Sequence, residues 1–222
     1  MLPDEMFSRV KINGMLKIKL YSPSELNLLR HIACAAGSGL HVIEIEPIFC
    51  YGGVHYFASG LRVADANNLL QFDRATERII QMSHKSVRKI IIDEDYNIVG
   101  LCFPPLAKLS VLHVRLFNPG NVWGAILGID YPRKMPVLKE VKLELIKLNR
   151  NYEPQFGDFM HLSTSVCILE IESGYNQSNV WPLPRVFPIV SVLHFRTQII
   201  DNMVRDVFLH WCRLEQLTLW MN

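Results

Sequence analysis

The chain of 222 residues lacks the features that identify several large protein classes. Lysine and arginine form no long run and the formal net charge is +2, so we expect no nucleic-acid binding. No apolar run approaches the roughly 18 to 20 residues that span a bilayer. The opening MLPDEMFSRVK carries two acids and shows no signal-peptide pattern. We therefore expect an intracellular protein, cytoplasmic or nuclear, that enters no membrane.

Motifs for catalysis and metal binding are also missing. The five cysteines contain no C-x-x-C pair, which argues against a zinc ribbon or a dithiol redox site. The eight histidines form no H-x-x-x-H pair, and no G-x-S-x-G sequence is present. We expect reduced thiols, no metal, no cofactor and no catalytic residues.

What the chain does contain is a short apolar frame that recurs. Half of the residues are hydrophobic, which predicts a folded chain with a large core. The frame is apolar-x-x-apolar-x-apolar, and its copies start 20 to 29 residues apart. They are Met15/Ile18/Leu20, Leu40/Ile43/Ile45, Val87/Ile90/Ile92, Leu109/Leu112/Val114, Leu138/Val141/Leu143, Val166/Leu169/Ile171, Val190/Leu193/Phe195 and Leu214/Leu217/Leu219, with a weaker copy at Asn67/Leu70/Phe72.

The positions that alternate with the frame are polar. Successive side chains of a strand point to opposite faces, so these positions should face water if the frame faces a core. The residue between the last two frame positions is polar in eight of nine copies, and the residue after the frame is charged in seven of nine. This alternation predicts short strands with one dry face and one wet face.

The segments between frames should return the chain to the start of the next strand. Ser22, Pro23 and Glu25 form a capping box that predicts a helix, and residues 74–82 and 203–212 also have helical spacing. Proline precedes three frames, in FPPLAKL, MPVLKEV and FPIVSVL, as expected for residues just outside a strand. A unit of this size cannot bury its apolar face alone, so the units should stack.

With these frames, the chain resembles leucine-rich repeat proteins over roughly residues 15–222. The repeats from Met135 to Leu143 and from Phe187 to Phe195 are similar to the irregular repeats of F-box proteins. The resemblance implies an α/β fold: a right-handed solenoid with a parallel sheet on its concave face and short helices or 3₁₀ turns on its convex face. It also implies that the repeats recruit a substrate for a ubiquitin ligase, whose adaptor would bind an F-box in missing N-terminal sequence.

The predicted organisation has two parts. Residues 1–14 form an N-terminal segment, a remnant of an F-box or a cap, in which LPDEMF is similar to the start of an F-box. Residues 15–222 form about nine irregular repeats. We expect them to be incomplete at the C-terminus, because the chain stops just after a frame and an uncapped parallel edge would be sticky.

The predicted function is non-catalytic binding of a protein partner on the concave face. Its candidate residues alternate with the frames and carry charges of mixed sign, which suits a protein better than a polyanion. They are Glu44, Glu46, Asp93, His113, Arg115, Lys142, Glu144, Glu170, Glu172, His194, Arg196 and Trp220.

Two other hypotheses stay open. The chain could be a small α/β enzyme that binds a nucleotide or S-adenosylmethionine at a glycine loop, Gly37 to Gly39, although those glycines also fit the C-cap of a helix. It could also be a structural product without a partner.

Overall fold

The computed structural model describes residues 12–20, 26–47, 74–94, 103–116, 129–145, 162–173, 183–197 and 208–221. Within these ranges the chain forms eight strands. They are β1 (Ile12–Leu20), β2 (Ala36–Pro47), β3 (Lys89–Glu94), β4 (Val111–Leu116), β5 (Glu140–Leu145), β6 (Ile168–Ser173), β7 (Val192–Thr197) and β8 (Gln216–Met221).

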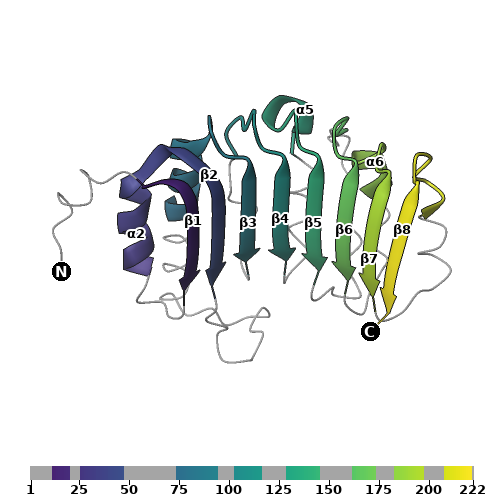
Figure 1. Cartoon of the computed structure of the whole chain (residues 1–222), viewed down its shortest axis with the longest axis horizontal. Coiled ribbons are helices and arrows are strands. Elements are labelled where there is room, and N and C mark those ends of the chain that lie inside the picture. The colour runs from purple at the N-terminus through teal and green to yellow at the C-terminus, as the bar shows by residue number, and fades with distance from the viewer. Residues whose placement is uncertain are drawn as a thin grey trace, which may run out of the picture.

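The eight strands make one open sheet whose spatial order equals their order in the sequence. Every neighbouring pair is parallel. Figure 1 shows the strands side by side, pointing the same way from β1 to β8. Each connection therefore carries the chain back to the starting edge of the sheet and forward by one strand, which is the α/β arrangement of a one-dimensional stack.

Helical segments are few among the described residues. They are α2 (Leu26–Ala35), residues 74–83, α5 (Tyr131–Lys134) and α6 (Leu183–Val186). Asp130 caps α5, because its side chain accepts a hydrogen bond from the backbone N–H of Arg133 at 3.2 Å. In Figure 1, α2 lies beside β1 at one end of the sheet, and α5 lies beyond the starting ends of the strands. None of the described helices has the length and apolar character needed to cross a membrane.

The second and third frame positions form two rows on one face of the sheet, which we call the inner face, and the described side chains of these rows are buried in β1 to β7. The second row is fully buried in the centre, for example at Ile43, Val141, Leu169 and Leu193. Leu29 from α2 and Ile79 and Ile80 from the 74–83 helix join the same core. These rows explain the register, because a slip of one residue would move every apolar side chain to the opposite face.

A backbone ladder repeats this register where the strands begin. The residue after each first frame position is bonded to its counterpart in the preceding unit: the N–H of Ser110 donates to the carbonyl of Arg88 at 2.8 Å. The same bond joins Lys139 to Ser110 at 3.0 Å and Cys167 to Lys139 at 3.0 Å. It continues through Ser191 and Glu215, so successive units are equivalent in hydrogen bonding as well as in packing.

The turn before each later strand adds a further buried position, three residues before the frame. Leu106, Met135 and Phe187 occupy it in successive or near-successive units, and Trp211 occupies it before β8. The indole N–H of Trp211 donates to the carbonyl of Phe187 at 2.9 Å, so a polar atom of this core ring is satisfied by the previous unit. Proline follows Phe103, Met135 and Phe187 in the sequence. In each case it precedes the strand, which confirms the predicted position of these prolines.

The frame predicted for β1 is wrong by two residues. Leu16 aligns with Ile43 and Ile18 with Ile45, so Leu16 and Ile18 are the second and third frame residues. Met15, predicted to be buried, is 57% exposed. The strand contains several apolar residues that fit either choice, and its true first frame position is not apolar. The outward residue between the inner pair is therefore Lys17 rather than Lys19.

The other predicted helices and frames are confirmed only in part. The predicted helix at 74–82 is confirmed as 74–83. The weak frame at Asn67/Leu70/Phe72 and the capping box at 22–25 lie outside the described residues, but β2 pairs directly with β3, so no strand lies between them. Of the helix predicted at 203–212, the described part from 208 onward is mostly turn, although its Trp211 does pack into the core.

Gly37 and Gly39 lie in strand β2, so the predicted helix C-cap is wrong: α2 ends at Ala35 and β2 begins at Ala36. Both glycines pass close to Asn13 of β1, whose side-chain oxygen accepts a hydrogen bond from the N–H of Gly39 at 3.1 Å. A Cβ on Gly37 would stand 2.8 Å from the carbonyl oxygen of Ile12, and one on Gly39 would stand 2.7 Å from the Asn13 oxygen. Glycine is required at both positions because β1 and β2 approach too closely to leave room for a Cβ atom.

The buried rows predict a sharp difference between equivalent leucines. Leu169→Ala in β6 removes a fully buried side chain and should cost about 2–5 kcal/mol of unfolding free energy. Leu217→Ala changes the same row in β8, where the side chain is 41% exposed, and should cost less than about 1.5 kcal/mol. Urea unfolding of both variants measures the difference. Equal losses of unfolding free energy would contradict the expected dependence on how deeply each leucine is buried.

The contact between β1 and β2 predicts different behaviour for its two glycines. A Cβ on Gly37 meets the Asn13 side chain and also the Ile12 carbonyl, so Gly37→Ala should destabilise the protein by about 1–3 kcal/mol and Asn13→Ala should relieve only part of that cost. The nearest atoms to a Cβ on Gly39 all belong to the Asn13 side chain, so Asn13→Ala should remove most of the cost of Gly39→Ala. A double-mutant cycle by urea unfolding tests this coupling. Complete rescue of Gly37→Ala by Asn13→Ala, or no rescue of Gly39→Ala, would contradict it.

Candidate functional site

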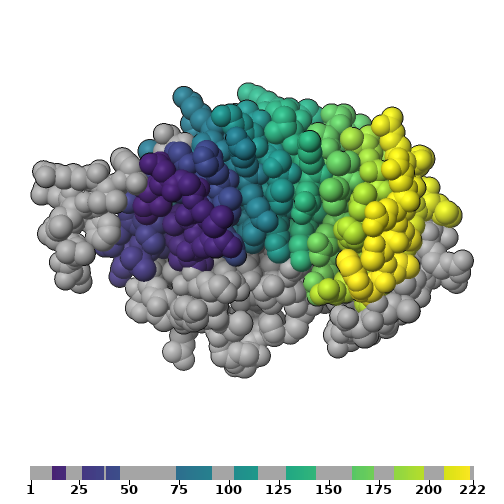
Figure 2. All heavy atoms as spheres, viewed as in Figure 1, coloured from purple at the N-terminus to yellow at the C-terminus, as the bar shows by residue number. Residues whose placement is uncertain are grey.

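The candidate site is the face of the sheet opposite the buried rows, which we call the outer face. The register aligns its residues into three rows, of which the first two cross all eight strands and the last is aligned from β1 to β2 and from β3 to β8. The first row is Met15, Val42, Lys89, Val111, Glu140, Ile168, Val192 and Gln216. The middle row is Lys17, Glu44, Ile91, His113, Lys142, Glu170, His194 and Thr218. The last row is Lys19, Glu46, Asp93, Arg115, Glu144, Glu172, Arg196 and Trp220. Figure 2 shows the strands as one continuous band of surface in chain order.

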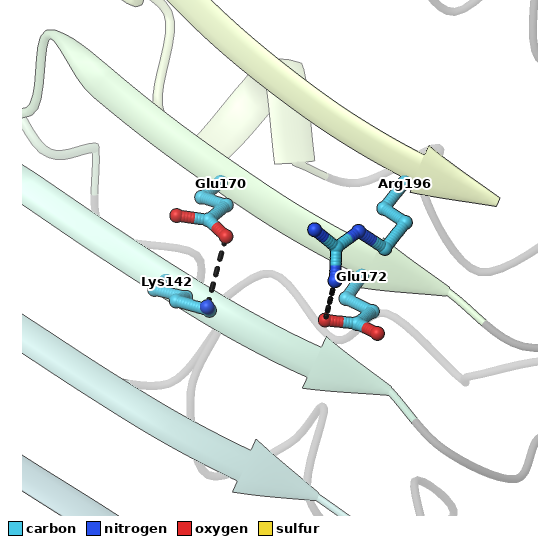
Figure 3. A network of polar contacts seen from close by, with 4 residues as sticks. All are labelled: Lys142, Glu170, Glu172 and Arg196. Atoms are coloured by element: carbon cyan, nitrogen blue, oxygen red, sulfur yellow. Dashed lines mark ion pairs between the residues drawn. The ribbon is translucent and has the colours of Figure 1, made fainter. Parts of the chain in front are cut away.

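Charges of the middle and last rows pair across neighbouring strands. Lys17 of β1 contacts Glu44 of β2 at 2.6 Å, and Lys142 of β5 contacts Glu170 of β6 at 2.9 Å. Arg196 of β7 contacts Glu172 of β6 at 3.5 Å. Figure 3 shows the last two pairs side by side on the same face. Acids and bases are interspersed along the rows, so the face does not form an extended positive surface for phosphates.

The middle and last rows end on β7 and β8 in an aromatic cluster, made by His194, Arg196 and Trp220. The ring of His194 stacks on Trp220 with centroids 5.5 Å apart, and the guanidinium of Arg196 lies 5.4 Å from the centre of the Trp220 ring. Trp220 remains 38% exposed. The Nδ1 atom of His194 is buried without a hydrogen-bond partner among the described residues. An indole held between two neighbours loses little freedom when it contacts a partner, which favours such rings as anchors.

The first row is mostly apolar and was missed by the sequence analysis. Val42, Val111, Ile168 and Val192 are each partly exposed, and Met15 is more than half exposed. Ile91 in the middle row extends this apolar strip toward the charged rows. The residue before the second frame position carries the signal: it is valine or isoleucine in four strands and methionine in β1, although Lys89 on β3 and Glu140 on β5 interrupt the row. An apolar strip beside paired charges is the composition of a protein-binding surface.

All twelve predicted site residues occupy outer-face register positions in strands β2 to β8. The side chains of Glu46, Asp93, Arg115 and Glu144 lie outside the described part of the structure. The ion pairs and ring contacts described above therefore involve none of these four residues. Lys17 was missed, because the frame of β1 was placed two residues too late. His113 and His194 lie on β4 and β7, three strand spacings or roughly 14 Å apart, too far to share one metal ion.

The titratable and metal-binding groups show no further cluster within the described ranges. No three His, Cys, Asp or Glu side chains there gather closely enough to hold a metal ion. Burial raises the pKa of Tyr131, which packs edge-on against Phe187 with ring centroids 5.3 Å apart. This phenol therefore stays neutral and belongs to the core.

The outer face thus combines paired charges, apolar residues of the first row and one aromatic cluster. Comparison with known proteins finds no matching family model, no matching curated protein and no matching solved structure.

Proposed function

We propose that this chain is a leucine-rich-repeat solenoid that binds a protein partner on the outer face of its sheet and carries out no catalysis. The observation that carries the proposal is the alignment of eight parallel strands, which places two continuous outer rows and a third, interrupted one on the same face. Seven spacings of about 4.8 Å give these rows a length of roughly 34 Å. That length suits an extended segment or a folded surface of a protein.

The repeated architecture supports the leucine-rich-repeat assignment. Each unit places its apolar side chains at equivalent positions of the inner rows, and the ladder from Arg88 to Ser191 joins equivalent backbone groups. From Val87 onward the frames begin 22 to 29 residues apart, as in leucine-rich repeats, whereas the frames at Leu40 and Val87, whose strands pair directly, begin 47 residues apart. In a right-handed stack of this type the sheet lines the concave side, which would make the outer face concave.

The chemistry of the outer face supports a protein as the partner. Paired charges such as Lys142 with Glu170 give a pattern that a partner must match in sign and position. The aliphatic strip supplies area that gains from being covered, and Trp220 supplies an aromatic anchor.

The structure gives less support to two other functions considered from the sequence, nucleotide binding and recruitment to a ubiquitin ligase. Gly37 and Gly39, which suggested a nucleotide-binding loop, are explained by the close contact of β2 with Asn13. The segment LPDEMF, which suggested an F-box, lies outside the described residues. Recruitment of a substrate to a ubiquitin ligase therefore rests on the resemblance alone.

A charge swap tests the proposed surface without unfolding the protein. The double variant Lys142→Glu/Glu170→Lys restores an ion pair and keeps the net charge, and exposed pairs contribute only about 0–1 kcal/mol. We expect an unfolding free energy within about 1 kcal/mol of the natural protein. Binding should fall by about tenfold or more, because each partner charge now meets its own sign. Quantitative affinity capture from native extract, followed by titration of the captured protein, measures the loss.

The matched control is Arg185→Glu on α6, an exposed charge reversal away from the outer face. It should leave capture unchanged. If the swapped variant and the natural protein retain the same proteins to the same extent, the outer face does not carry the binding.

A further inference from the structure

The edge of the sheet at which the strands begin carries an excess of positive charge. We call this edge the entry rim, and it consists of the segments directly before β3 to β8: residues 84–88, 103–110, 129–139, 162–167, 183–191 and 208–215. These segments contain eight lysine or arginine residues and two acids. In Figure 1 they lie at the starting ends of the strands, where α5 also lies. We infer that the entry rim binds the surface of an anionic phospholipid membrane.

Six of the eight cations come from three neighbouring units, those of β3, β4 and β5, and form a basic cluster. The cluster contains Lys85, Arg88, Lys108, Arg133, Lys134 and Lys139. Five of the six are exposed and Lys134 is partly exposed. Within the described ranges none of the six forms an ion pair, whereas Lys17, Lys142 and Arg196 of the outer face each form one. The charge of the cluster is therefore available to an external anion.

Backbone hydrogen bonds hold the parts of the basic cluster together. The N–H of Ser110 donates to the carbonyl of Arg88 at 2.8 Å, and the N–H of Lys139 donates to the carbonyl of Ser110 at 3.0 Å. Arg88 and Lys139 are thus two strand spacings, or roughly 10 Å, apart. The N–H of Leu106 donates to the carbonyl of Lys134 at 2.6 Å, which brings the end of α5 beside the turn before β4. Cations up to 55 positions apart in the sequence therefore share one surface.

The two acids of the entry rim offset only a small part of this charge. Asp130 lies next to the cluster, where its side chain caps α5. Glu215 is in the unit of β8, three strand spacings or roughly 14 Å from Lys139 along the backbone ladder. The first outer row adds Lys89 and Glu140, whose charges cancel. A net positive potential therefore extends over the units of β3 to β5.

The entry rim also exposes aliphatic side chains. Val137, Leu162 and Leu209 lie in its segments and are 43%, 51% and 79% exposed. A membrane surface accepts both features, because cations meet the anionic headgroups while aliphatic side chains bury themselves at the boundary of the acyl chains. Clusters of four to eight lysines and arginines are typical of proteins that bind anionic lipids.

A nucleic acid or a protein fits the entry rim less well than a membrane does. Single-stranded bases stack on aromatic side chains, and protein interfaces are rich in aromatic residues and poor in lysine. The entry rim has the opposite composition, since four of the six cations of the basic cluster are lysines. Its aromatic rings are buried or partly buried against the core: Phe103, Tyr131, Phe187, Phe208 and Trp211. Lipid headgroups need no stacking surface, and contact with one leaflet needs no segment that spans the bilayer.

Vesicle flotation of the full chain tests the contribution of charge. We expect binding to vesicles of phosphatidylcholine that contain about 30% phosphatidylserine, and no binding to phosphatidylcholine alone. Each cation near an anionic leaflet strengthens binding by about fivefold, so Lys108→Glu/Lys139→Glu should weaken it by at least about tenfold. The matched control Arg30→Glu/Arg74→Glu makes the same change of net charge at two exposed helix positions outside the entry rim, and should weaken binding by less than about threefold. Equal losses, or equal binding to both kinds of vesicle, would overturn the inference.

A pair of leucines tests the aliphatic contribution. Leu162 of the entry rim and Leu28 of α2 are 51% and 49% exposed, so replacing either removes a similar exposed area. Leu162→Ser should weaken binding to the anionic vesicles by about fivefold, and Leu28→Ser should leave it unchanged. The same effect of both substitutions would contradict insertion at the entry rim.

Two soluble polyanions separate a membrane from other anionic partners. Duplex DNA and polyglutamate offer negative charge without acyl chains, so both should bind more weakly than the anionic vesicles at equal concentrations of anionic groups. Tighter binding of either polyanion would overturn the membrane as the partner of this surface.

Circular dichroism and urea unfolding of each variant separate loss of binding from loss of fold. The outer-face variant Lys142→Glu/Glu170→Lys should retain full binding to the vesicles, because neither residue belongs to the entry rim. Vesicle binding and affinity capture of a protein partner therefore test different surfaces. A loss with this variant as large as that with Lys108→Glu/Lys139→Glu would overturn the assignment to the entry rim.

Discussion

The fold depends on one constraint: every unit must present its two inner apolar residues at the same height as those of its neighbours. Ile43, Ile90, Leu112, Val141, Leu169 and Leu193 form one such row, and each is nearly or fully buried because the strand on either side supplies the contact. The backbone ladder from Arg88 to Glu215 follows the same register. Side-chain packing and backbone pairing therefore specify a single alignment, and a slip in one strand would expose its whole apolar set.

The outer face inherits its order from this constraint. Residues that alternate with the buried rows are brought into line whether or not they interact, so acids and bases far apart in the sequence become neighbours. Lys142 and Glu170 are 28 positions apart and yet form an ion pair. A partner on this face would meet a fixed pattern of charge, and little conformational entropy would be lost on binding because the strands are already held.

The sequence was most informative where the two-residue alternation was strong. Seven frames from Leu40 onward lie at or just before a strand, and their outward columns occupy one face, because charged residues between apolar ones leave only one possible orientation. The frame of β1 was misplaced since Met15, Leu16, Ile18 and Leu20 satisfy two registers. Only pairing with β2 distinguishes them.

Features that depend on contacts between strands could not be predicted. Glycines at 37 and 39 suggested a ligand loop or a helix cap, but their reason is the Asn13 side chain, 26 residues before Gly39. The apolar strip of the first outer row was missed because each of its residues stands alone in its own strand. The register places Ile168 and Val192 side by side and brings Val42 and Val111 into the same row, in which Lys89 and Glu140 stand between apolar residues.

A stack of equivalent units is stable in its interior and incomplete at its ends, since each end unit lacks one neighbour. Helix α2 covers the inner residues of β1, whereas Leu217 and Leu219 of β8 stay exposed. Burial of an inner residue therefore depends on a neighbouring strand on each side, as the contrast between the fully buried Leu193 of β7 and the 41% exposed Leu217 of β8 shows. The outer face shares this dependence, because its rows are ordered only where the register continues from one strand to the next.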